Sequence, residues 1–108
     1  MRVLFDQATP VPLRSFLQGH TVRTAAQERW DRLPNGELLN AAEAARFGVL
    51  LTTDKNLRYQ QNLRGRKLAI VILGQGRWDL IRRHVAAVVA AVNAASPGSY
   101  AEVQIPYD

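Results

Sequence analysis

The pattern of apolar and polar positions divides the chain into short strands and helices. Apolar runs at residues 3–5, 49–51 and 70–72 have the length that is typical of buried strands. His20–Thr24 holds one strongly apolar residue, and Tyr100–Ile105 alternates as an edge strand does. We therefore expect five strands, at residues 1–6, 20–24, 49–51, 67–73 and 100–105.

Apolar residues at helical spacing predict helices between these strands. Thr9 and Pro10 suit an N-cap and a first helical residue, and Gly19 suits the end of the same helix. Asn35 is a favourable N-cap for a second helix, and Glu37 would face the positive end of its dipole. The expected helices cover residues 10–18, 35–46 and 78–95, with a helical turn within 24–32 and a short helix or turn at 57–62.

The order of these elements predicts an α/β fold in one domain over residues 1–108. Right-handed crossovers would stack helices on both faces of a mostly parallel sheet. The length of 108 residues suits one hydrophobic core, and 47% hydrophobic residues are too many for a disordered chain. No apolar run approaches the ~20 residues of a membrane span. We therefore expect a cytoplasmic protein without a membrane partner.

Charge and cysteine content narrow the classes of function. A formal net charge of +5 favours an anionic partner, such as nucleic acid or an acidic protein, although a basic surface also aids solubility. The chain has no cysteine, which excludes a disulfide scaffold, a thiolate metal site and cysteine nucleophilic catalysis. It also lacks a glycine-rich phosphate loop and a G-x-S-x-G elbow.

Three carboxylates are the candidates for chemistry. Asp6 and Asp54 follow apolar strands, and Glu37 lies at the start of the helix before the third strand. The carboxyl ends of parallel strands share one edge of a sheet, so the three side chains could converge there. Converging carboxylates favour a bound cation or a raised pKa, and their hard oxygens suit Mg²⁺ or Mn²⁺. The alternative is that Asp6 caps a helix and Glu37 only faces a helix dipole.

Polar and basic residues lie close to these carboxylates in the sequence. Asn35 and Asn56 could support a ligand, or they could simply form turns. Lys55 and Arg58 could follow a phosphate backbone, and Tyr59 could stack on a base. A solvated basic loop accounts for the same three residues without any ligand.

Three segments form a more specific combination than any one of them alone. They are Arg2-Val3-Leu4-Phe5-Asp6, Asn35-Gly36-Glu37-Leu38-Leu39, and Leu51-Thr52-Thr53-Asp54-Lys55-Asn56-Leu57 followed by Tyr59-Gln60-Gln61-Asn62-Leu63. In this combination the chain resembles the short PIN-like family, small bacterial proteins related to VapC-type toxins. The resemblance extends to about residue 93.

The resemblance implies a PIN-like three-layer sandwich with a mostly parallel central sheet. It also implies a Mg²⁺- or Mn²⁺-dependent ribonuclease, often a toxin that a cognate antitoxin neutralises. Asp6, Glu37 and Asp54 match the acidic residues that gather at the sheet edge in this family. Many relatives carry further acids where this chain has Gln7, Asn35 and Asn56.

Three hypotheses follow for the function. In the first, Asp6, Glu37 and Asp54 hold the metal ion of a ribonuclease, Lys55 and Arg58 position the RNA, and Asn56 assists as a neutral group. In the second, the amides in place of acids indicate a non-catalytic PIN-like module that binds nucleic acid or a partner protein. In the third, the helix at 78–95 makes the chain a structural homodimer.

Overall fold

The computed structural model describes residues 1–107 and contains a five-stranded parallel sheet. The strand order is β2-β1-β3-β4-β5, and every neighbouring pair is parallel. The strands are β1 (Arg2–Phe5), β2 (Thr21–Thr24), β3 (Val49–Thr52), β4 (Ala69–Leu73) and β5 (Tyr100–Val103). All five expected strands are present, and the α/β fold predicted from the sequence is confirmed.

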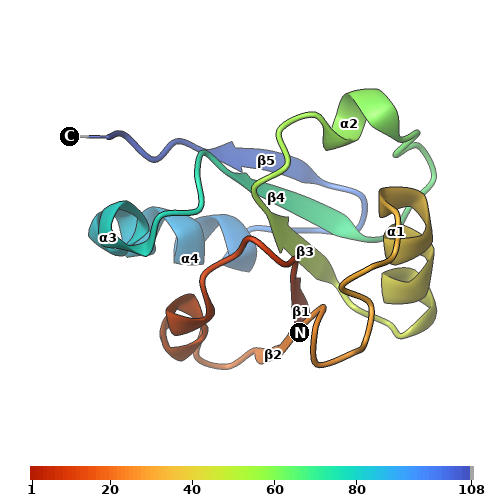
Figure 1. The fold of residues 1–108 in the computed structure, drawn as a ribbon, viewed down its shortest axis with the longest axis horizontal. Coiled ribbons are helices and arrows are strands. Elements are labelled where there is room, and N and C mark those ends of the chain that lie inside the picture. The colour runs from red at the N-terminus through yellow and green to blue at the C-terminus, as the bar shows by residue number, and fades with distance from the viewer. Residues whose placement is uncertain (108) are drawn as a thin grey trace.

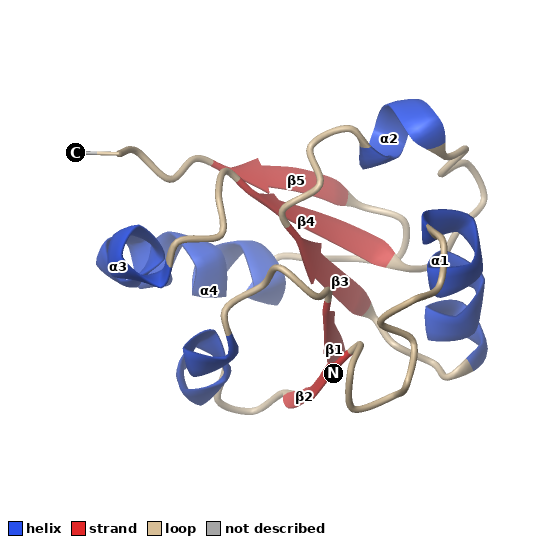
Figure 2. Cartoon of the chain, in the orientation of Figure 1, coloured by secondary structure: helices blue, strands red, loops and turns tan. Residues whose placement is uncertain are grey.

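Helices cover both faces of the sheet and make three layers (Figure 1, Figure 2). One face packs Val3, Val49 and Val71 against helices from the two ends of the chain. These are the 3-10 helix η1 (Val11–Phe16), then α3 (Trp78–Ile81) and α4 (Val85–Asn93), with the short η2 (Arg82–His84) between α3 and α4. The other face packs Leu4 and Leu50 against α1 (Asn35–Ala44) and α2 (Leu57–Gln60). Alternate residues of each strand therefore fill two separate cores.

Two of the predicted helices differ from those observed. The segment 10–18 forms only the six-residue η1, and Thr9 does not cap it, because the Thr9 hydroxyl donates to the Leu51 carbonyl (2.8 Å). Two prolines and the short span leave few donors for a full α-helix. The segment 78–95 is broken at His84, where φ is −124° and ψ is 22°. Apolar residues keep helical spacing across this break, so the pattern does not reveal it.

The remaining segments differ less from the elements that the sequence predicts. Residues 25–29 form hydrogen-bonded turns without helix, closed by bonds such as Trp30 N–H to the Ala25 carbonyl (2.8 Å). The second helix begins at Asn35 as expected, but Pro34 occupies the N-cap position. Within residues 1–107, no helix has the length and apolarity needed to cross a bilayer.

The direction of winding reverses between β1 and β3. Strand β1 pairs with β2 on one side and with β3 on the other, so the chain winds in opposite directions from this point. In open α/β sheets, ligands bind outside the carboxyl ends of the strands at such a switch point. The residues that follow β1 and β3 are therefore the first to consider for function.

Candidate functional site at the carboxyl edge of the sheet

One threonine joins the two aspartates at the switch point. Asp6 follows β1, and Thr52 is the last residue of β3. The Thr52 hydroxyl donates to Asp6 Oδ2 (2.9 Å) and accepts from the backbone N–H of Asp54 (3.2 Å). Thr52 is 1% exposed, so this link is sheltered from water. The hydroxyl of Thr52 thus contacts the Asp6 carboxylate and the Asp54 backbone at the ends of two neighbouring strands.

Neutral donors also hold the other oxygens of the two carboxylates. The Gln7 backbone N–H donates to Asp6 Oδ1 (2.8 Å), and the Asn56 backbone N–H donates to Asp54 Oδ1 (3.0 Å). The Asn35 side-chain amide donates to Asp54 Oδ2 (3.0 Å). Across residues 1–107 the three ion pairs are Arg23–Glu28, Arg66–Glu43 and Arg77–Asp79. Both aspartates are therefore oriented by hydrogen bonds without a basic partner.

Asn35 has a different role from the one predicted. It was expected to cap α1, but it is the first residue of that helix, and its side chain turns to Asp54 instead. Asn56 contacts Asp54 through its backbone, and it occupies the N-cap position of α2 without a capping side-chain bond. The start of α1 is thus tied to the loop after β3.

Glu37 lies apart from the hydrogen-bonded pair. It is exposed on the first turn of α1, and within the described part of the chain it takes part in no side-chain hydrogen bond or ion pair. Residues 1–107 also contain no group of three or more His, Cys, Asp and Glu side chains that could hold a metal ion. The expected convergence of three carboxylates is reduced to Asp6 and Asp54.

The loops around this pair pack closely. Thr9 fixes the loop after β1 to the carbonyl of Leu51 at the end of β3. The loop after β4 approaches so closely that a Cβ added to Gly76 would lie 2.9 Å from the Ala8 carbonyl oxygen. Only glycine allows this approach, so three loops form one packed edge around the aspartates.

A cation–aromatic cluster lies on α2 and β5. The Arg58 guanidinium lies 4.8 Å from the Tyr59 ring centroid and 5.3 Å from that of Tyr100. Arg58 also donates to the Tyr59 hydroxyl (2.6 Å), which raises the pKa of the guanidinium. Partial burial raises the pKa of Tyr100, and its hydrogen bond to Glu102 (3.1 Å) acts in the same direction. Tyr59 is 72% exposed and presents an open ring to solvent.

Sequence reasoning missed the residues that connect the site. Thr52 appeared only as part of the Thr-Thr-Asp run, and its buried position at the end of β3 is the signal that marks it. Glu102 and Tyr107 were not singled out, although both line a cavity with Lys55. Protein-family models, curated proteins and solved structures were all compared with the chain, and none matches it.

Proposed function

We propose that the protein is a metal-dependent ribonuclease of the PIN-like type, with Asp6 and Asp54 as its metal ligands. The observation that supports this most is a pair of aspartates at the switch point of a parallel sheet, held by neutral donors alone. Two aspartates after neighbouring strands, with no basic partner among residues 1–107, retain a negative charge that a cation would neutralise.

The donor set fits a magnesium or manganese ion. Mg²⁺ is commonly held by one or two carboxylates, several waters and a substrate phosphate, so two aspartates suffice. Each carboxylate oxygen that accepts one hydrogen bond retains a second lone pair. The Asn35 amide nitrogen donates to Asp54 Oδ2, so Asn35 would orient this carboxylate for the ion. A bound ion would lower the pKa of a water and stabilise the charge of the reacting phosphate.

The protein's own residues would orient the ligands and the substrate. Thr52 fixes the relative position of the two aspartates, since its hydroxyl contacts both residues. Lys55 and Arg58 supply positive charge for the RNA backbone, and the exposed Tyr59 ring offers a surface for a base. Glu37, on the first turn of α1, adds negative charge near Asn35. In this proposal the substrate is cytoplasmic RNA and the protein is the toxin of a pair with a cognate antitoxin.

The hydrogen bonds of the two aspartate side chains favour a second function. Both oxygens of Asp6 and of Asp54 already accept a bond, so the edge is ordered without a cation. A non-catalytic module that binds RNA or a partner protein through Arg58 and Tyr59 would need nothing more. A structural homodimer through the segment 78–95 is the third hypothesis and is separate from this module.

The first test is a calorimetric titration of Mn²⁺ into the wild type and into Asp54→Asn. We expect binding by the wild type and a loss of at least about 100-fold in affinity in the variant, because an essential charged ligand is removed. Glu37→Gln should weaken binding less, since Glu37 stands outside the pair. RNA cleavage should require the metal and disappear on addition of EDTA.

Other results would decide for the second function. A wild type that binds no Mn²⁺, with or without RNA, would exclude the metal-dependent reading. Unchanged RNA binding by Asp6→Asn together with absent cleavage in the wild type would identify a non-catalytic module. Asp31→Asn is the matched control, because Asp31 is an exposed carboxylate in the loop before α1.

A further inference from the structure

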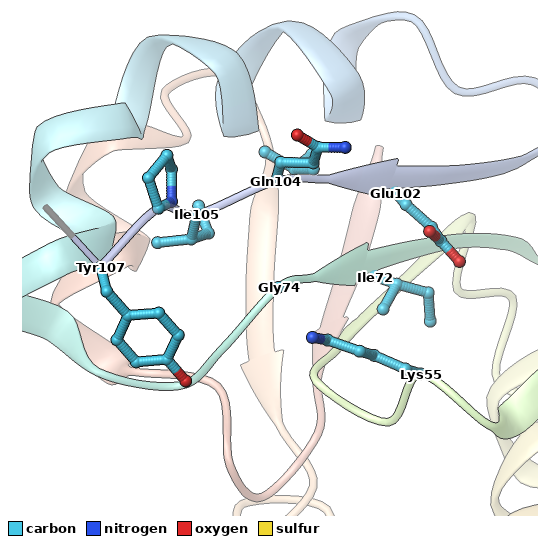
Figure 3. A pocket seen from close by; sticks show the side chains of 9 residues that line it. Lys55, Ile72, Gly74, Glu102, Gln104, Ile105 and Tyr107 are labelled. Carbon is cyan, nitrogen blue, oxygen red and sulfur yellow. The ribbon is translucent and has the colours of Figure 1, made fainter.

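A cavity of about 420 Å³ lies at the carboxyl ends of β4 and β5 (Figure 3). Its lining includes the apolar side chains of Ile72 and Ile105 and the polar ends of Lys55, Glu102 and Tyr107. Lys55 directly follows Asp54 in the chain, so the cavity begins one residue from the proposed metal ligands. Its volume is in the range of pockets for small ligands.

We propose that this cavity receives one nucleoside of the RNA strand and prefers guanine. The proposal rests on the proposed function, because it assigns the nucleotide next to the phosphate at Asp6 and Asp54. Lys55 would contact the phosphate on the side of the aspartates. Tyr107 would stack on the base, and Glu102 would accept hydrogen bonds from the base edge.

The mixed charge of the lining supports a nucleoside over a second phosphate. Lys55 attracts one anionic group, but the Glu102 carboxylate repels another. In residues 1–107 these two side chains form no ion pair within 4.0 Å, so each remains available to a ligand. A nucleotide offers a phosphate at one end, N–H donors at the other and an apolar ring face between them.

The chemistry of Glu102 selects among the bases. Its Oε1 accepts from the Tyr100 hydroxyl (3.1 Å), which orients the carboxylate while leaving lone pairs on both oxygens. Guanine presents two adjacent N–H donors on its Watson–Crick edge, and a carboxylate can accept both. Uracil presents one N–H donor between two carbonyl oxygens, which a carboxylate repels.

The wall formed by the chain after β5 is held in place before any ligand binds. Gln75 is buried, and its side-chain amide donates to the Ile105 carbonyl (2.8 Å). The Gly74 N–H donates to the Val103 carbonyl (2.9 Å), and a Cβ at Gly74 would lie 3.0 Å from the Ile105 nitrogen. Because this segment is tied to the end of β4, the cavity is pre-formed, which lowers the ordering cost of binding.

The test is an NMR titration of the ¹⁵N-labelled chain with GMP and with UMP, in EDTA so that no metal contributes. We expect shifts of the amides of residues 72–74, 102–105 and 107, with GMP bound about tenfold more tightly than UMP. Glu102→Gln should remove this preference. Tyr107→Ala should lower the affinity for both nucleotides about tenfold. Tyr107→Phe should bind them as the wild type does, because the aromatic ring is retained.

Matched controls separate this proposal from the proposed nuclease. Asp31→Asn, an exposed carboxylate away from the cavity, should leave nucleotide binding unchanged. Equal affinities for GMP and UMP, or shifts confined to other residues, would overturn the proposal. A short RNA with one guanosine should shift the same amides, whereas a chain that binds GMP but not this RNA would overturn the assignment to RNA. Nucleotide binding with no Mn²⁺ binding would remove the nuclease proposal while the cavity site stands.

Discussion

The two ends of α1 hold carboxylates in opposite electrostatic surroundings. At the end of the helix, beside the amino edge of the sheet, Glu43 pairs with Arg66 and also accepts the Lys67 backbone N–H (3.2 Å). At its start, beside the carboxyl edge, Asp54 accepts only from neutral groups, one of them the Asn35 amide. Glu43 and Asp54 are both partly buried, so exposure does not separate them.

The difference between Glu43 and Asp54 suggests that the two edges of the sheet have different roles: one contributes to stability, and the other is the proposed site of metal binding. A carboxylate paired with Arg66 has its charge neutralised inside the protein and contributes to folding. A carboxylate held by neutral donors keeps its charge for an external cation, and its orientation is already fixed. The comparison therefore predicts that substitutions at the amino edge change stability alone, whereas substitutions at the carboxyl edge change metal binding.

The largest effect on metal binding, short of removing an aspartate, is expected from Thr52→Val. Valine keeps the shape of the buried threonine but removes the hydroxyl that joins Asp6 to the Asp54 backbone. The affinity for Mn²⁺ should fall about 10- to 100-fold, as for other groups that orient metal ligands. Stability should fall by about 1–3 kcal/mol, because a buried N–H loses its acceptor.

Calorimetry and thermal unfolding measure the two effects of Thr52→Val separately. Thr21→Val is the control, since Thr21 is an exposed strand residue in β2 and should change neither quantity. An Mn²⁺ affinity within twofold of the wild type would show that the threonine link does not organise the aspartates.

The next largest effect is a loss of stability caused by a substitution at the amino edge of the sheet. Arg66→Met keeps the aliphatic stem but leaves Glu43 without its cation. Because both side chains are mostly buried, 19% and 26% exposed, unfolding free energy should fall by about 1–3 kcal/mol. Mn²⁺ affinity should not change, and chemical denaturation measures the loss.

The Arg23–Glu28 pair, whose arginine is more exposed than Arg66, is the matched control for this substitution. Its arginine side chain is 41% exposed, so Arg23→Met should cost about 0–1 kcal/mol. If Arg66→Met and Arg23→Met cost the same, the amino-edge pair would have no special role in stability.

The central strands of the sheet could be predicted from the sequence because they are buried on both faces. Strands that are buried on both faces read as continuous apolar runs, and 3–5, 49–51 and 70–72 are such runs. A polar residue directly after such a run must lie at the carboxyl edge. The sequence therefore predicts that Asp6 and Asp54 share the carboxyl edge, but that they follow neighbouring strands depends on the strand order.

The details of the site depend on contacts between segments that are distant in sequence. Asn35 has the signature of an N-cap, and nothing local shows that its amide reaches Asp54, 19 residues later. The cavity depends on how the chain after β5 is fixed to Gln75, 30 residues before Ile105. Helix breaks are equally hidden when apolar spacing continues, as it does across His84.

The smallest expected effect, and the most direct test of the comparison, comes from Asn35→Asp. This change places a third carboxylate about where the amide now donates to Asp54. Without metal, repulsion between the two should lower stability by about 1 kcal/mol. With Mn²⁺, the added charged ligand should raise the affinity for the ion about three- to tenfold. The same Mn²⁺ concentration should therefore stabilise the variant more than it stabilises the wild type.

Asn40→Asp makes the same chemical change at the other end of α1. Asn40 accepts from Arg66 (3.0 Å), so the new carboxylate would face a cation that is already present. Thermal unfolding with and without Mn²⁺ should therefore show no metal-dependent gain for Asn40→Asp and a clear gain for Asn35→Asp. Equal stabilisation of both variants by Mn²⁺ would mean that the ion responds only to the net charge of the protein. Extra stabilisation of Asn35→Asp alone would locate the cation beside Asp54.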